Sequence, residues 1–227
     1  MNQTRGERLT IEGEDHDPVS AIHLVAPAEV ALLVMAHGAG APMTHVFMES
    51  TAEALADRGI STLRYNFSYM EQGRRRPDHA KRLTRVVASA LSAGRRLAGD
   101  LPLVAGGKSM GGRMTSTLLS ESEGPPELRG IVFFGFPLHA PRKPDDKRAA
   151  HLGSVRYPTL FLQGTRDDLA DLTLLRPHVH AMGDSATLHV VEGADHSFKV
   201  LKRSGRTAEE VGDELADVTA GWIQGLG

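Results

Sequence analysis

The sequence predicts an α/β fold, in which a mostly parallel sheet is covered by helices on both faces. Apolar runs of strand length alternate with helical patterns along the 227 residues, and this alternation is typical of parallel sheets. Several runs are apolar at nearly every position, which indicates strands that are buried on both faces. No low-complexity segment or long linker divides the chain, so residues 1–227 are expected to form a single domain.

The first half of the chain gives three strands and two helices. Apolar runs bounded by turn residues predict strands at 19–26, 30–36 and 60–65. Apolar residues at helical spacing predict a helix over 50–57, which Gly59 ends. The clearest amphipathic helix is expected over 78–97. Its apolar face is formed by Leu83, Val86, Val87, Ala90, Leu91 and Leu97.

The second half of the chain repeats the alternation. Residues 101–105 predict a strand, and 114–122 predict a helix that is followed by Gly124-Pro-Pro. Further apolar runs predict strands at 131–136, 159–163 and 188–191. An amphipathic helix over 209–223 is expected to close the chain.

Composition excludes several functional classes. The chain is 41% hydrophobic and 24% charged, the balance of an ordinary globular protein, and its formal charge of −2 argues against nucleic-acid binding by bulk electrostatics. It has no cysteine, which excludes disulfides and thiolate metal ligands. We see no signal peptide, and the longest apolar run, 30–36, is too short to cross a bilayer. We therefore expect a cytoplasmic protein without membrane association, while the oligomeric state stays open.

One segment carries the strongest functional signal. Gly107-Lys-Ser-Met-Gly111 follows a predicted strand and precedes a helical segment, as a nucleophile elbow does. Glycine lacks the Cβ that would clash at this strained turn, and the strain exposes the hydroxyl of Ser109 for attack on a carbonyl. Taken alone, the motif also fits a glycine-rich turn with a solvated serine. A phosphate-binding loop is disfavoured, because Pro102 stands where that loop requires its first glycine.

A serine nucleophile requires a histidine base and an orienting carboxylate, which follow it in the order acid, then histidine, in one hydrolase arrangement. Asp167 follows the predicted strand 159–163, and His196 follows the last predicted strand. Both therefore belong to the carboxyl edge of a parallel sheet, where ligands bind. The neighbouring Asp168 suits an Asx turn or a helix N-cap, which is also the alternative interpretation of Asp167.

The oxyanion hole requires two backbone N–H groups. We assign one to Met110, the residue after the nucleophile, and the other to Ala39 in the small-residue turn that follows the strand 30–36. His37 precedes Ser109 in the chain, which is the wrong order for the base, so we interpret it as a structural residue of this turn.

Five motifs together resemble the α/β-hydrolase superfamily. They are His37-Gly-Ala-Gly, Gly107-Lys-Ser-Met-Gly-Gly112, Phe136-Pro-Leu-His-Ala-Pro, Gln163-Gly-Thr-Arg-Asp167 and Gly193-Ala-Asp-His-Ser-Phe198. Within it, they are similar to the dienelactone-hydrolase-like branch of small proteins, which includes testis-expressed protein 30 and the hydrolase-like domain of an NSL-complex subunit. The resemblance covers residue 30 to the C-terminus and implies the α/β-hydrolase fold, with an eight-stranded, mostly parallel sheet and a Ser109–Asp167–His196 triad.

The resemblance implies a serine hydrolase that cleaves a carboxylic ester, thioester or related acyl bond of a small molecule, with no cofactor or metal. True dienelactone hydrolases use a cysteine nucleophile, so this chain, which has none, departs from them. Because the branch includes members thought to act as scaffolds, the alternative is a catalytically silent protein-interaction module.

Two further segments bear on the substrate. Arg74-Arg75-Arg76 lies in the loop after the strand 60–65 and forms either a solvated face or a rim that attracts acidic substrates. Residues 138–157 occupy the usual place of a hydrolase lid but are short and polar, with Pro141 and Pro144. They predict a minimal lid with one short helix over 145–152.

Overall fold

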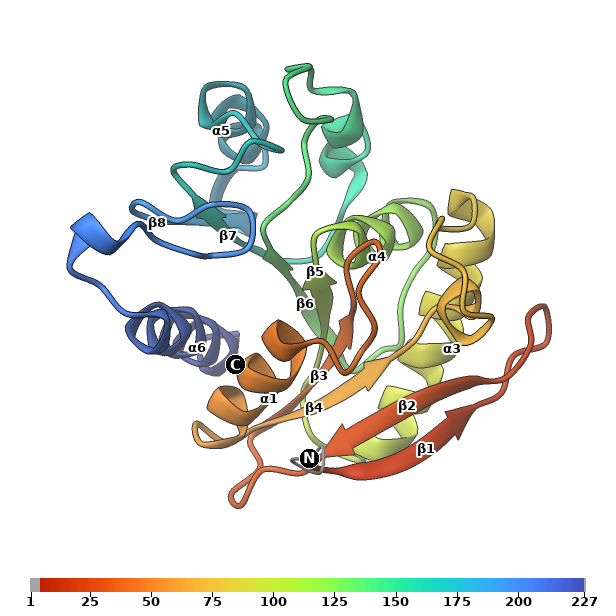
Figure 1. Ribbon diagram of the computed structural model, residues 1–227. Helices are drawn as coiled ribbons and strands as arrows, with labels where there is room; N and C mark the ends of the chain where they lie inside the picture. The colour runs from red at the N-terminus through yellow and green to blue at the C-terminus, as the bar shows by residue number, and fades with distance from the viewer. Residues whose placement is uncertain (1–4, 227) are drawn as a thin grey trace.

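The computed structural model describes residues 5–226, and an eight-stranded sheet forms its centre (Figure 1). The strands are β1 (Glu7–Ile11), β2 (Val19–Leu24), β3 (Ala31–Ala36), β4 (Ile60–Tyr65), β5 (Leu103–Lys108), β6 (Leu128–Phe134), β7 (Thr159–Gly164) and β8 (Ala186–Val191). Their order across the sheet is β1-β2-β4-β3-β5-β6-β7-β8. Within residues 5–226, β2 is antiparallel to β1 and to β4, whereas β3 and the strands from β4 to β8 pair in parallel. The predicted mostly parallel sheet is therefore confirmed.

Helices cover both faces of this sheet (Figure 1). They are α1 (Val46–Ala56), α2 (Ser68–Glu71), α3 (Ala80–Ala98), α4 (Met110–Glu121), α5 (Leu172–Ala181) and α6 (Ala208–Gln224). On one face, α3, α4 and α5 bury an apolar cluster that includes Val86, Met114 and Leu175. On the other, α1 and α6 bury a second cluster through Leu55 and Leu215. The two clusters explain why the central strands are apolar at nearly every position.

The chain between β6 and β7 differs from the expected single helix over 145–152. Two 3₁₀ turns, Lys147–Ala149 and Leu152–Ser154, stand there instead. Between them, Nε2 of His151 lies 2.7 Å from the hydroxyl oxygen of Ser116 on α4. Burial and the nearby charge of Arg113 lower the pKa of His151 to about 4, so this contact is made by a neutral ring. It holds the segment down against α4 as a small flap rather than a separate cap.

The topology brings three loop regions to one edge of the sheet. Because β5, β7 and β8 are parallel, the residues that follow them emerge at the same end. Ser109 directly follows β5, Asp167 lies three residues after β7, and His196 lies five residues after β8. Open parallel sheets bind ligands at this carboxyl edge.

Candidate active site

Ser109 forms a sharp turn between β5 and α4. Its φ of 50° and ψ of −116° lie in a region that residues with a side chain rarely adopt. Its N–H donates to the carbonyl of Phe134 on β6 at 3.1 Å, which ties the turn to the sheet. A Cβ on Gly107 or Gly111 would lie 2.2 or 2.4 Å from the carbonyl oxygen of Ala36. The spacing of glycines around the serine therefore reflects direct contact with the backbone of β3.

Replacing Gly107 with alanine is expected to lower the free energy of unfolding by about 3 kcal/mol or more, because overpacking and backbone strain both act there. The φ of Gly107 is 152°, and the clashing atom belongs to a paired strand that cannot move aside. Gly212→Ala is the matched control, since Gly212 lies inside α6 and a Cβ there meets nothing within 4 Å. It should be neutral or stabilise by about 1 kcal/mol. Urea unfolding checks both, and equal stabilities for the two variants would contradict this account of the turn.

The three predicted side chains lie in one hydrogen-bonded chain. Nε2 of His196 is 2.8 Å from Oγ of Ser109, and Nδ1 of His196 is 2.7 Å from Oδ2 of Asp167. A carboxylate only accepts hydrogen bonds, so Nδ1 carries the proton and the lone pair of Nε2 faces the hydroxyl. This is the tautomer that a general base for Ser109 requires.

Asp167 is buried and held by two further donors. Nε2 of Gln163 donates to its Oδ2 at 2.5 Å, and the N–H of Leu169 donates to its Oδ1 at 2.8 Å. The amide of Gln163 is oriented in turn, because its Oε1 accepts from the N–H of Phe136 at 2.9 Å. Sequence reasoning gave Gln163 no role, although it lies within one of the quoted motifs. Asp168, the neighbouring candidate, is exposed.

The two predicted oxyanion donors flank the serine. Met110 is the first residue of α4, where backbone N–H groups have no partner within the helix. The turn that contains Ala39 passes close to the nucleophile, since a Cβ on Gly38 would lie 3.6 Å from the Cβ of Ser109. Both segments therefore lie next to Ser109, and the assignment of Met110 and Ala39 as donors stays a prediction.

His37 fixes this turn as a neutral residue. Its Nε2 accepts the N–H of Phe67 at 3.1 Å, so its Nδ1–H donates to the carbonyl of Gly38 at 2.7 Å. Burial lowers the pKa of His37 to about 4, which keeps the ring uncharged at neutral pH. These contacts agree with a structural rather than a basic role.

The comparisons with known proteins identify the family and support the fold. The profile of the alpha/beta hydrolase domain family matches residues 29–224. The chain belongs to the α/β-hydrolase family. Structures similar to this chain include a dienelactone hydrolase from Anabaena variabilis, with 17% identity, a TM-score of 0.76 and 98% of each chain covered.

Two more solved structures share the fold. The esterase domain of a Rhodothermus marinus protein is 14% identical, with a TM-score of 0.73, and the match covers 98% of this chain and 100% of that domain's chain. A serine hydrolase without a lid from Xanthomonas campestris is 16% identical, with a TM-score of 0.71, and the match covers 100% of this chain and 95% of the Xanthomonas chain. The last agrees with the small flap seen here.

One of the three arginines after β4 has ion-pair and hydrogen-bond partners within the protein. Arg74 forms an ion pair with Asp78 at 2.7 Å and also donates to Gln72. Arg75 and Arg76 are exposed. Arg75 and Arg76 are therefore the two arginines of the run to which the hypothesis of a substrate-attracting rim still applies.

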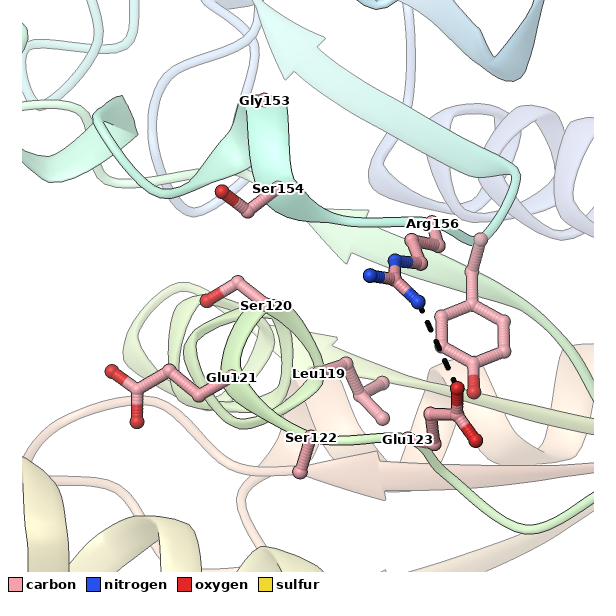
Figure 2. Close-up of a pocket in the computed structure, with 9 residues that line it drawn as sticks. Leu119, Ser120, Glu121, Ser122, Glu123, Gly153, Ser154 and Arg156 are labelled. Carbon is pink, nitrogen blue, oxygen red and sulfur yellow. Dashed lines mark ion pairs between the residues drawn. The ribbon is translucent and has the colours of Figure 1, made fainter.

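A polar groove of about 730 Å³ lies at the far end of α4 from Ser109 (Figure 2). Its lining includes Ser120, Ser154 and an exposed ion pair in which Arg156 and Glu123 are 3.7 Å apart. The 12 residues of α4 span about 18 Å, which separates this groove from the serine. It does not form part of the candidate active site.

Residues 5–226 contain neither a cluster of metal ligands nor a membrane-spanning helix. No group of three or more His, Cys, Asp or Glu side chains there is arranged to hold a metal ion. No helix within the same residues has the length and apolar character needed to span a bilayer.

Proposed function

We propose that the protein is a serine hydrolase of the dienelactone-hydrolase-like branch, which cleaves a carboxylic ester, thioester or related acyl bond. The observation that carries the proposal is the hydrogen-bonded chain from Ser109 through His196 to Asp167, with contacts of 2.8 and 2.7 Å. The similarity to an esterase domain and to a dienelactone hydrolase supports the reaction class.

In the proposed acylation step, Oγ of Ser109 bonds to the carbonyl carbon while its proton passes to Nε2 of His196. The carbonyl oxygen becomes an oxyanion, which the N–H groups of Met110 and Ala39 stabilise. When the tetrahedral intermediate collapses, the bond to the leaving group breaks and His196 returns the proton to the leaving oxygen or sulfur. Asp167 stabilises the transient imidazolium and keeps the ring oriented.

Deacylation repeats the same steps with water. His196 removes a proton from water as its oxygen attacks the acyl-enzyme, and the carboxylic acid leaves as Ser109 regains the proton. The balanced reaction consumes one ester or thioester and one water and gives one acid and one alcohol or thiol. The residues named here supply every proton transfer that this reaction requires.

A fluorophosphonate probe tests the proposal, because it reacts covalently with an activated serine. Wild-type protein should be labelled stoichiometrically, with mass addition on Ser109, and should hydrolyse p-nitrophenyl esters of graded chain length. A well-folded wild type that is neither labelled nor active on the panel would overturn the proposal. The same result, together with co-purification of a stable partner, would favour the catalytically silent interaction module.

A further inference from the structure

Lys108 directly precedes Ser109, and the proposed reaction gives it no role. Its side chain leaves the end of β5 and reaches the loop that carries His196. There Nζ donates to the backbone carbonyl of His196 at 2.5 Å. Two adjacent residues of one strand end thus contact the two ends of one histidine: Ser109 meets the imidazole, and Lys108 meets the carbonyl.

The ammonium of Lys108 is enclosed by aromatic rings. Nζ lies 5.6 Å from the ring centre of Phe47 on α1 and 5.1 Å from that of Phe198. The two rings stack on each other with centres 5.8 Å apart, and a cation over aromatic faces is attracted by their quadrupoles. On another side lies Gly135, where a Cβ would come within 2.9 Å of Nζ. The absence of a side chain at Gly135 therefore makes room for the cationic end of residue 108.

The loop around His196 is held by its own contacts and by hydrogen bonds to the segment that follows β7, where the N–H of Arg166 donates to the carbonyl of Ala194 at 2.9 Å. Oδ1 of Asp195 accepts the N–H groups of Ser197 and Lys199, at 2.8 and 3.0 Å. The N–H of Phe198 donates to the carbonyl of Asp195 at 2.9 Å. These bonds shape the loop without fixing it to β5. The bond from Lys108 to the His196 carbonyl makes that attachment.

We propose that Lys108 is a positioning residue, whose ammonium anchors the backbone of His196 so that its imidazole stays in register with Ser109. The inference rests on the proposed serine hydrolase function. Asp167 and Ser109 hold the imidazole of His196, and the bond from Lys108 adds an attachment of its backbone to the end of β5. Near-attack geometry is demanding, and a displacement of about 1 Å costs about 100-fold in rate.

Charge strengthens this anchor. Hydrogen bonds from an ammonium are about twice as strong as those between neutral groups. Burial lowers the pKa of Lys108 to about 8, while the carboxylates of Asp167 and Asp195 oppose the shift. The other groups that pack on the ammonium are His196, through its neutral carbonyl, and uncharged rings and glycine. Loss of the Lys108 proton near pH 8 should therefore weaken the anchor and lower kcat.

The test compares Lys108→Met, which keeps much of the packing but removes the donor, with Lys108→Arg, which keeps both charge and donors. Lys199→Met is the matched control, because Lys199 is an exposed lysine of the same loop. For the best ester of the panel, Lys108→Met should lower kcat by about 10- to 100-fold with KM unchanged. Lys108→Arg should restore at least a third of wild-type kcat, and Lys199→Met should match wild type.

The pH profile separates positioning from a merely structural role. Wild-type kcat should fall above about pH 8, as Lys108 loses its proton. In Lys108→Arg this fall should disappear below pH 10, because a guanidinium keeps its charge there. An unchanged alkaline fall in Lys108→Arg, or wild-type kcat in Lys108→Met, would overturn the inference.

A readout without catalysis keeps the inference separate from the proposed function. Amide hydrogen exchange in residues 192–200 should be at least tenfold faster in Lys108→Met than in wild type or Lys199→Met, in variants whose thermal unfolding stays cooperative. If Lys108→Met does not fold, Lys108→Gln takes its place. Should wild type lack esterase activity, the proposed function fails, and exchange alone decides the role of Lys108. Amide exchange in Lys108→Met that equals exchange in wild type would overturn the proposed role of Lys108.

Discussion

Replacing Ser109 with alanine is expected to lower kcat by about a million-fold, as removal of the nucleophile does in other triads. The hydroxyl oxygen lies 2.8 Å from Nε2 of His196, and alanine leaves that base with no group to activate. The oxyanion donors and the binding surface remain, so a residual rate about 10³- to 10⁴-fold above that in water is expected. Burst-phase and steady-state kinetics with a p-nitrophenyl ester measure the loss.

Ser120→Ala controls for the general effect of removing a hydroxyl from this region. Ser120 lies near the other end of α4, where its hydroxyl donates to the carbonyl of Thr117 at 2.8 Å. The Ser120→Ala variant should keep wild-type kcat. Activity in Ser109→Ala within tenfold of wild type would show that hydrolysis proceeds without this serine, and the proposed acyl-enzyme would be wrong.

Much of the fold could be predicted because buried strands leave a clear pattern. The strand predicted at 60–65 matches Ile60–Tyr65 at both ends, and all six of its residues are buried. The strand Glu7–Ile11 gave no such signal, since four of its five residues are not buried and it forms the antiparallel edge of the sheet. An edge strand of this kind has no continuous apolar run to detect.

Helix starts were harder to predict, for two different reasons. The helix α4 begins at Met110 rather than 114, although Gly111 and Gly112 disfavour helices. Packing against the sheet requires glycine in this first turn, because a Cβ on Gly111 would meet the backbone of β3. The helix α1 begins at Val46 rather than 50, capped by His45, whose Nδ1 accepts the N–H of Phe47. Histidine is not among the residues that usually signal a helix start.

At the site, the order of motifs along the chain located the three side chains that lie in contact, because each follows a strand of the parallel part of the sheet. The groups that orient them were missed. Gln163 contacts Asp167 from four residues away, and Lys108 contacts a carbonyl 88 positions along the chain. Such bonds depend on where loops place backbone atoms, which residue type and spacing do not encode.

Replacing Asp167 with asparagine is expected to lower kcat by about 10⁴-fold, the effect of the corresponding change in a serine protease triad. Both oxygens of Asp167 accept hydrogen bonds: Oδ2 from His196 and Gln163, and Oδ1 from the N–H of Leu169. An asparagine NH₂ in the position of Oδ2 faces His196 as a donor. The ring must then keep Nδ1 unprotonated and carry its proton on Nε2, so it cannot accept the proton of Ser109.

The alternative orientation of the new side chain does not avoid a penalty. An NH₂ in the position of Oδ1 would meet the N–H of Leu169, leaving a buried donor unsatisfied at a cost of about 1–3 kcal/mol in stability. Both orientations leave a donor unsatisfied, that of Gln163 in the first and that of Leu169 in the second, so both should lower stability in thermal unfolding. The loss of kcat, measured on the same sample, therefore reports which way the amide turns. Asp168→Asn is the matched control, since that carboxylate is exposed. If Asp168→Asn lost more activity than Asp167→Asn, the catalytic acid would be Asp168 and not Asp167. The hydrogen bond from His196 to Asp167 would then have no role in catalysis.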